Sequence, residues 1–120
     1  MSAVNVDAIK RERNTKTFAA GEIIFTEGDK DNDCMYVVEQ GQVEIANAKR
    51  FLEVIEPGGF FGEMALVNDK PRSATAKAKT DCVAIEVNQG DFYFLVQHSP
   101  HFAIQVMQVL SERVRRNTDT

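Results

Sequence analysis

Residues 58–75 read Gly-Gly-Phe-Phe-Gly-Glu-Met-Ala-Leu-Val-Asn-Asp-Lys-Pro-Arg-Ser-Ala-Thr, and this stretch indicates both a fold and a ligand site. It places Gly62 and Glu63 at the start of a predicted short helix, and Arg72, preceded by a proline, at the start of a strand. The first N–H groups of a helix are unpaired and carry the positive end of its dipole, so they attract a phosphate. The rigid fork of Arg72 can close on the same phosphate with two parallel hydrogen bonds.

Glu63 does not favour a phosphate, but it can accept a hydrogen bond from a sugar hydroxyl beside one. One anionic group and one hydroxyl in a small site indicate a nucleotide-like ligand. Each residue also has a purely structural interpretation. Gly62 can be a plain turn, Glu63 a carboxylate in the first turn of a helix, and Arg72 the partner of Asp69 or Glu63 in a surface ion pair.

The same stretch resembles the phosphate-binding cassette of the cyclic nucleotide-binding domain family, Phe-Gly-Glu-Leu-Ala-Leu, a short loop, then Pro-Arg-x-Ala-Thr. Here residues 61–66 read Phe-Gly-Glu-Met-Ala-Leu and residues 71–75 read Pro-Arg-Ser-Ala-Thr. Only Met64 departs from the pattern, and Leu to Met keeps volume and apolarity. Residues 21–29 resemble the family's opening strand and turn, and residues 35–43 its central hairpin.

The resemblance implies that Arg72 neutralises a cyclic phosphate, that Glu63 holds the ribose, and that the amides of Ala65 and Ser73 face the phosphate. In this family Thr at the position of Ser73 is associated with guanine and Ala with adenine, so Ser is intermediate. We expect cAMP as the ligand, with cGMP as the alternative. The predicted ligand-binding residues are Phe61, Gly62, Glu63, Met64, Ala65, Arg72, Ser73 and Ala74.

The final helix is expected to act as a lid over the base. Alignment to the family by Pro100 places Arg113 and Asn117 at base-facing positions, although a solvated polar helix end explains both equally well. The family pattern further implies that Leu66 couples the cassette to the hinge helix that begins near Asp91.

Composition and periodicity predict a single, mainly β domain. The 120 residues are 43% hydrophobic and 27% charged, which is ordinary for a globular protein. Short apolar runs at even spacing, separated by polar or glycine-containing turns, indicate an antiparallel β-roll or jelly roll with a short cassette helix. The expected strands are 23–25, 34–39, 42–46, 51–55, 74–78 and 82–87.

The predicted organisation has three parts: a polar segment over residues 1–14 with a short helix at 6–13, the β-roll over 15–88, and two C-terminal helices over 89–120. The first of these two helices covers 91–98. The second is expected to be capped by Ser99, with Pro100 in its first turn. Its apolar stripe comprises Phe102, Ala103, Val106, Met107, Leu110 and Val114.

Several classes of function are disfavoured. No nucleophile–base pair is visible, so we do not expect an enzyme. His98 and His101 lack a supporting cluster, so no metal is expected. Cys34 and Cys82 are better explained as buried free thiols than as a disulfide. A net charge of −4 argues against nucleic acid as the main partner.

No apolar run approaches the roughly 20 residues of a membrane span, and no secretory signal is visible, so we expect a cytoplasmic protein. The predicted role is a stand-alone cyclic nucleotide sensor, a monomer or weak dimer, that acts on a protein effector in trans. Two alternatives stay open: a β-roll that binds proteins and no nucleotide, and a regulatory fragment of a larger kinase, channel or transcription factor.

Overall fold

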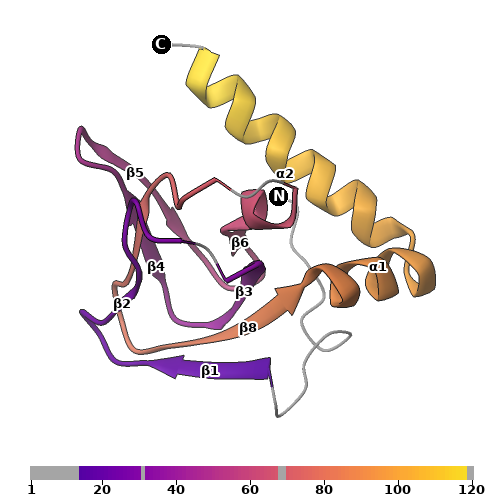
Figure 1. Cartoon of the computed structure of the whole chain (residues 1–120), viewed down its shortest axis with the longest axis horizontal. Coiled ribbons are helices and arrows are strands. Elements are labelled where there is room, and N and C mark those ends of the chain that lie inside the picture. The colour runs from indigo at the N-terminus through magenta and orange to yellow at the C-terminus, as the bar shows by residue number, and fades with distance from the viewer. Residues whose placement is uncertain (1–13, 31, 68–69, 119–120) are drawn as a thin grey trace.

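The computed structural model describes residues 14–30, 32–67 and 70–118, with side chains as far as Arg115. It is a β-roll followed by two helices (Figure 1). The elements are β1 (Thr15–Phe18), β2 (Ile23–Phe25), β3 (Cys34–Gln40), β4 (Val43–Ala46), β5 (Phe51–Ile55), β6 (Phe60–Phe61), the 3-10 helix η3 (Glu63–Leu66), β7 (Thr75–Ala78), β8 (Cys82–Asn88), α1 (Gln89–His98) and α2 (His101–Thr118).

Two four-stranded antiparallel sheets form the roll. The first has the strand order β1-β8-β3-β6 and the second the order β2-β7-β4-β5. β3 and β8 form the long central pair, in which Met35 lies opposite Val87 and Val37 opposite Ile85. The short strand β6 pairs with β3 at Tyr36 and Val37, and this pairing fixes the cassette that follows β6 against the edge of the first sheet.

The first sheet is buried on both faces because its strands alternate between two hydrophobic clusters. Met35, Val37, Ile85 and Val87 point to the cluster beneath the helices. Their neighbours Tyr36, Val38 and Ala84 point between the two sheets. Phe60 and Phe61 divide in the same way, Phe60 towards the helices and Phe61 towards the interior of the roll. The cassette therefore begins where the two clusters meet.

The helices follow β8 directly. Asn88 caps α1 through a capping box, since its side chain accepts a hydrogen bond from the Asp91 amide and the Asp91 side chain accepts one from the Asn88 amide. The chain then turns at Ser99 and Pro100 into α2, which runs across the roll above β6 and the cassette (Figure 1). Leu95 of α1 and Phe102 and Val106 of α2 pack on the helix-side cluster.

The predicted fold is confirmed, with differences at the element boundaries. The strands β1 and β6 were not predicted, because Thr15–Thr17 are polar residues of an edge strand and Phe60–Phe61 is too short to show periodicity. α1 begins at Gln89 and not at the predicted residue 91, because the Asn88 cap offsets the weak helix propensity of Gly90. α2 begins at His101, after Pro100. The helix predicted at 6–13 lies outside the described residues.

The predicted apolar stripe of α2 is correct at Phe102, Val106 and Leu110 and wrong at Met107 and Val114. Phe102 and Val106 are buried, whereas Met107 is 56% exposed and Val114 62% exposed. Val109 and Leu110 are the residues that continue the contact with the core. The helix is packed on one side only, so the i, i+3 and i+4 spacing alone did not decide which apolar residues face the roll.

Gly41 provides a test of the turn between β3 and β4. Its φ is 82°, and an added Cβ would lie 2.2 Å from the Asp81 carbonyl oxygen. Gly21 has a similar φ of 89° but nothing within 4 Å of such a Cβ. Gly21→Ala should therefore lower the free energy of unfolding only by the cost of a left-handed conformation at alanine, roughly 1–2 kcal/mol. Gly41→Ala should lower it clearly further, as measured by urea denaturation. Equal losses for the two variants would contradict the steric argument.

Candidate functional site

The cassette begins with a left-handed glycine. Gly62 has φ 75° and ψ 17°, and it directly precedes the single 3-10 turn Glu63–Leu66. A Cβ at this position would lie 2.9 Å from Nη1 of Arg72, so glycine is required both by the backbone conformation and by the close approach of the guanidinium. The Ala65 amide donates to the Gly62 carbonyl at 3.2 Å. A phosphate that binds this amide therefore has to displace that hydrogen bond.

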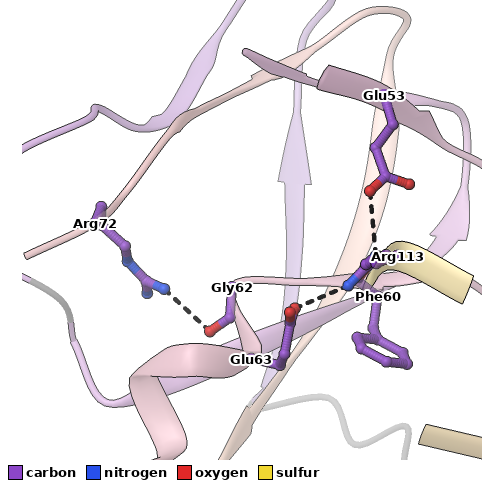
Figure 2. Close-up of polar contacts among 6 residues, drawn as sticks. All are labelled: Glu53, Phe60, Gly62, Glu63, Arg72 and Arg113. Carbon is purple, nitrogen blue, oxygen red and sulfur yellow. Dashed lines mark hydrogen bonds and ion pairs between the residues drawn. The ribbon is translucent and has the colours of Figure 1, made fainter. Parts of the chain in front are cut away.

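Arg72 turns into the protein and is only 7% exposed. Its Nη1 donates to the Gly62 carbonyl at 3.2 Å (Figure 2). Its Nη2 donates to Oδ1 of Asn32 at 2.7 Å and to the carbonyl of Cys34 at 3.0 Å. The guanidinium carbon lies 4.1 Å from the centroid of the Phe25 ring, a cation–π geometry. The side chain is thus fixed between the cassette and the roll.

These partners of Arg72 are all neutral. A buried cation is costly unless it is paired, and carbonyl, amide and ring contacts offset only part of that cost. Within residues 14–30, 32–67 and 70–118 no ion pair of Arg72 with a carboxylate is found, so the alternative of a pair with Glu63 is wrong. Asp69 lies outside the described residues. The site is therefore electrostatically suited to receive an anion.

A polar chain leads from Arg72 into the first sheet. Nδ2 of Asn32 donates to the Tyr36 hydroxyl at 2.9 Å, and that hydroxyl donates to Oε2 of Glu86 at 3.2 Å. The Tyr36 ring stacks on Phe61 with 5.3 Å between centroids. Burial raises the pKa of the Tyr36 hydroxyl, although the hydrogen bond from Asn32 opposes the shift. This chain keeps Asn32 oriented towards Arg72.

Glu63 is paired with Arg113 of α2 (Figure 2). Nη1 of Arg113 donates to Oε1 of Glu63 at 3.0 Å, and Nη2 donates to the Phe60 carbonyl. Nε of Arg113 lies 3.1 Å from Oε1 of Glu53 on β5, an ion pair without hydrogen-bond geometry. The guanidinium also lies over the Phe60 ring, 4.8 Å from its centroid. Arg113 thus links α2 to the cassette at Glu63 and to β5 at Glu53.

The remaining cassette residues divide into buried and exposed positions. Phe61, Ala65, Leu66 and Ala74 are buried, whereas Met64 is 53% exposed and Ser73 is exposed. Leu66 belongs to the same cluster as Leu95 of α1. The side chain of Gln89, the first residue of α1, donates to the Leu66 carbonyl at 3.0 Å. Leu66 is therefore joined to the start of α1 by a hydrogen bond and shares a hydrophobic cluster with Leu95 of that helix.

Comparison with known proteins decides the family. The model of the cyclic nucleotide-binding domain matches residues 15–99, which contain the whole roll, the cassette and α1. The chain belongs to the cyclic nucleotide-binding domain family. The predicted resemblance is thus confirmed.

The domain is similar to regulatory proteins of several kinds. It is 37% identical over 101 residues to a cyclic nucleotide-gated potassium channel of Mesorhizobium japonicum, covering 84% of this chain and 27% of the channel. A solved structure from a study of a cyclic-GMP-dependent signalling pathway in bacterial phytopathogenesis has a TM-score of 0.73 at 33% identity, with 84% of each chain covered. The cAMP-bound PfPKA-R (141–441) structure has a TM-score of 0.69 at 27% identity, covering 84% of this chain and 34% of that one.

The domain spans less than a third of the length of the curated relatives that it matches, between 19% and 29%. The relatives named as channels and as a kinase regulatory subunit therefore share only this module with it. In the described part of the chain, no helix combines the length and apolar character needed to cross a bilayer.

Several predicted residues are brought together in the structure and others are not tested by it. Arg72 contacts Gly62, and Arg113 of α2 contacts Glu63. The side chain of Asn117 lies outside the described residues, so its base contact stays a prediction. His98 and His101 are exposed, and the described residues contain no cluster of metal-ligating side chains. Both cysteines are free, with Cys82 buried and Cys34 only half-buried.

Sequence reasoning missed four residues of the site: Phe25, Asn32, Glu53 and Phe60. Phe25 supports Arg72 from β2, and Asn32 lies in a polar turn where nothing in the sequence distinguishes it from its neighbours. Glu53 lies on β5, 10 residues before Glu63 in the sequence. Only the antiparallel pairing within the roll brings it near Arg113, so no sequence pattern indicated it.

The buried hydroxyl and thiol groups predict loss of stability at alkaline pH. Burial raises the pKa of Cys34, Cys82 and Tyr36 in the folded protein. The unfolded chain therefore ionises first, and the free energy of unfolding should fall as the pH rises above about 8.5. Urea denaturation between pH 7 and 10.5 measures this slope. A Cys34→Ala/Cys82→Ala double variant should show a shallower decline above pH 8.5, and an unchanged slope would argue against the assignment.

Proposed function

We propose that this domain binds a cyclic mononucleotide, and that the ligand is cAMP. The observation that carries the proposal is the Arg72 guanidinium, buried beside the left-handed Gly62 with neutral partners from the described residues. A cyclic phosphate supplies the missing negative charge. Since Arg–phosphate pairs are charge-assisted and directional, this contact both attracts and orients the ligand.

The other cassette residues then have complementary roles. Backbone N–H groups of the turn that begins at Gly62 and of Ser73 donate to the phosphate, with the Ala65 amide exchanging its bond to Gly62. Glu63 accepts a hydrogen bond from the ribose 2′-hydroxyl. The base lies against the roll beneath α2, where Arg113 and Asn117 are the candidate lid residues. Phe61, Met64 and Ala74 complete the lining.

Ligand binding is proposed to shift the position of the helices. Contacts made by the cassette only in its closed state provide the differential affinity that moves such an equilibrium. Leu66 already contacts the cluster that contains Leu95, so tightening of the cassette is transmitted to α1 through this packing. The domain then acts on a protein effector in trans as a cytoplasmic monomer or weak dimer, or on segments of a longer protein.

Replacement of Arg72 is the direct test. A hydrogen bond to a charged group contributes roughly 1.5–3 kcal/mol, so Arg72→Ala should weaken cAMP binding about 10- to 150-fold by calorimetry. Arg72→Lys should also bind more weakly, because it keeps the charge but loses the fork. Arg50→Ala, at an exposed arginine in the β4–β5 turn, is the matched control. Parental affinity in a folded Arg72→Ala protein would refute the assignment.

Calorimetry with cAMP and cGMP on the unmodified protein tests the choice of base. We expect tighter binding of cAMP. Ser73→Thr should move the preference towards cGMP and Ser73→Ala towards cAMP, because the resemblance to the family associates Thr here with guanine and Ala with adenine. Binding of neither nucleotide by the folded protein would instead favour a β-roll that recognises other proteins.

A further inference from the structure

Arg72 is held by its backbone as well as by its side chain. The Gly28 amide donates to the Arg72 carbonyl at 2.8 Å, and the Arg72 amide donates to the Asp29 carbonyl at 2.8 Å. Residues 70–74 form neither helix nor strand. These two reciprocal hydrogen bonds therefore fix the main chain of Arg72 where no regular element does so.

The partner of Arg72 in these bonds is the exposed 26–29 turn, which follows β2. Oδ2 of Asp29 accepts a hydrogen bond from the Thr26 amide at 3.0 Å, and the Asp29 amide donates to the Thr26 carbonyl at 3.0 Å. An aspartate that accepts from a nearby backbone amide is a typical means of closing a turn. The Glu27 amide donates to Oγ1 of Thr75 at 2.9 Å, so the turn is also tied to the start of β7.

The chain on either side of this turn also reaches the guanidinium. The Phe25 ring, directly before the turn, lies 4.1 Å from the guanidinium carbon of Arg72. Asn32, which follows the turn, accepts from Nη2 at 2.7 Å. A fork that must meet a phosphate with two parallel hydrogen bonds tolerates little displacement, because a binding group has to be held within about 0.5 Å of its productive position. A shift of the turn would therefore displace the guanidinium.

We propose that Asp29, which closes the 26–29 turn, and Thr75, which anchors it, are positioning residues for Arg72 and thereby set the affinity for the ligand phosphate. This inference rests on the proposed cyclic nucleotide ligand. The carboxylate charge of Asp29 opposes an anionic ligand, whereas its hydrogen bond within the turn favours binding by holding Arg72. Substitutions that remove the charge with or without the hydrogen bond separate these two effects.

Calorimetry with cAMP on the whole chain tests the proposal. Asp29→Ala removes the hydrogen bond to the Thr26 amide and should weaken binding roughly 2- to 10-fold. Asp29→Asn removes the charge but keeps a side-chain oxygen that can accept the same hydrogen bond, so it should recover the parental affinity. Equal affinities of these two variants would overturn the inference, because the hydrogen bond would then have no effect on binding.

Thr75 and a control position complete the comparison. Thr75→Val should weaken cAMP binding and Thr75→Ser should not, because only serine keeps the hydroxyl that accepts from the Glu27 amide. Asp81→Ala is the matched control and should bind cAMP like the unmodified domain. Asp81 is also exposed and its Oδ1 also accepts from a backbone amide, that of Ala20 at 2.8 Å, but it lies between β7 and β8.

A double-mutant cycle tests whether Asp29 acts through Arg72. Asp29→Ala should weaken cAMP binding clearly less in an Arg72→Ala background than in the unmodified domain, because the side chain that it positions is then missing. The same fold-loss of affinity in both backgrounds would show a general structural effect and overturn the inference.

A measurement without ligand separates this inference from the proposed function. In the unliganded domain, Asp29→Ala should accelerate amide hydrogen exchange at Gly28 and Arg72, whereas Asp29→Asn and Asp81→Ala should leave it unchanged. Unchanged exchange at these two amides in Asp29→Ala would overturn the inference even where cAMP binds. If the unmodified domain binds neither cAMP nor cGMP, the proposed function fails, and the exchange rates still decide whether Asp29 holds the main chain of Arg72.

Discussion

The burial of one guanidinium is the constraint on which the site depends. Arg72 lies between the cassette and the roll, and its neutral partners among the described residues come from three separate segments, at Gly62, Asn32 and Cys34. A charge at 7% exposure is tolerated only where its surroundings are fixed. The left-handed Gly62, the Phe25 ring and the chain through Tyr36 to Glu86 all serve that requirement.

The two faces of the first sheet explain how such a site is connected to the helices. Phe61 packs in the interior of the roll against Phe25, the ring that faces Arg72, while Phe60 packs beneath α1 and α2 and contacts Arg113. Phe60 and Phe61, which are neighbours on β6, thus contact the surroundings of the two arginines from opposite faces of the sheet. A change at the cassette affects the packing on both faces, because a close-packed interior transmits strain.

Charge is distributed over the site in a complementary way. Arg72 has neutral partners from the described residues and can accept an anion, whereas Arg113 is already held between Glu53 and Glu63. The first arrangement leaves the charge of Arg72 without an ion pair among the described residues, and the second pairs a residue of α2 with β5 and η3. An arginine with neutral partners therefore lies at one end of the cassette, and an arginine paired with two glutamates lies at the other.

The β-roll and the position of the cassette could be predicted from the sequence, because local strand spacing, turn glycines and a contiguous motif carry that information. Tertiary structure alone decided that Met107 and Val114 face outwards, that Asn32 and Phe25 support Arg72, and that Arg113 meets Glu53 and Glu63. These contacts join residues 40 or more positions apart, or depend on which side of α2 meets the sheet. Long-range pairing within the roll sets these contacts, and no local sequence pattern encodes that pairing.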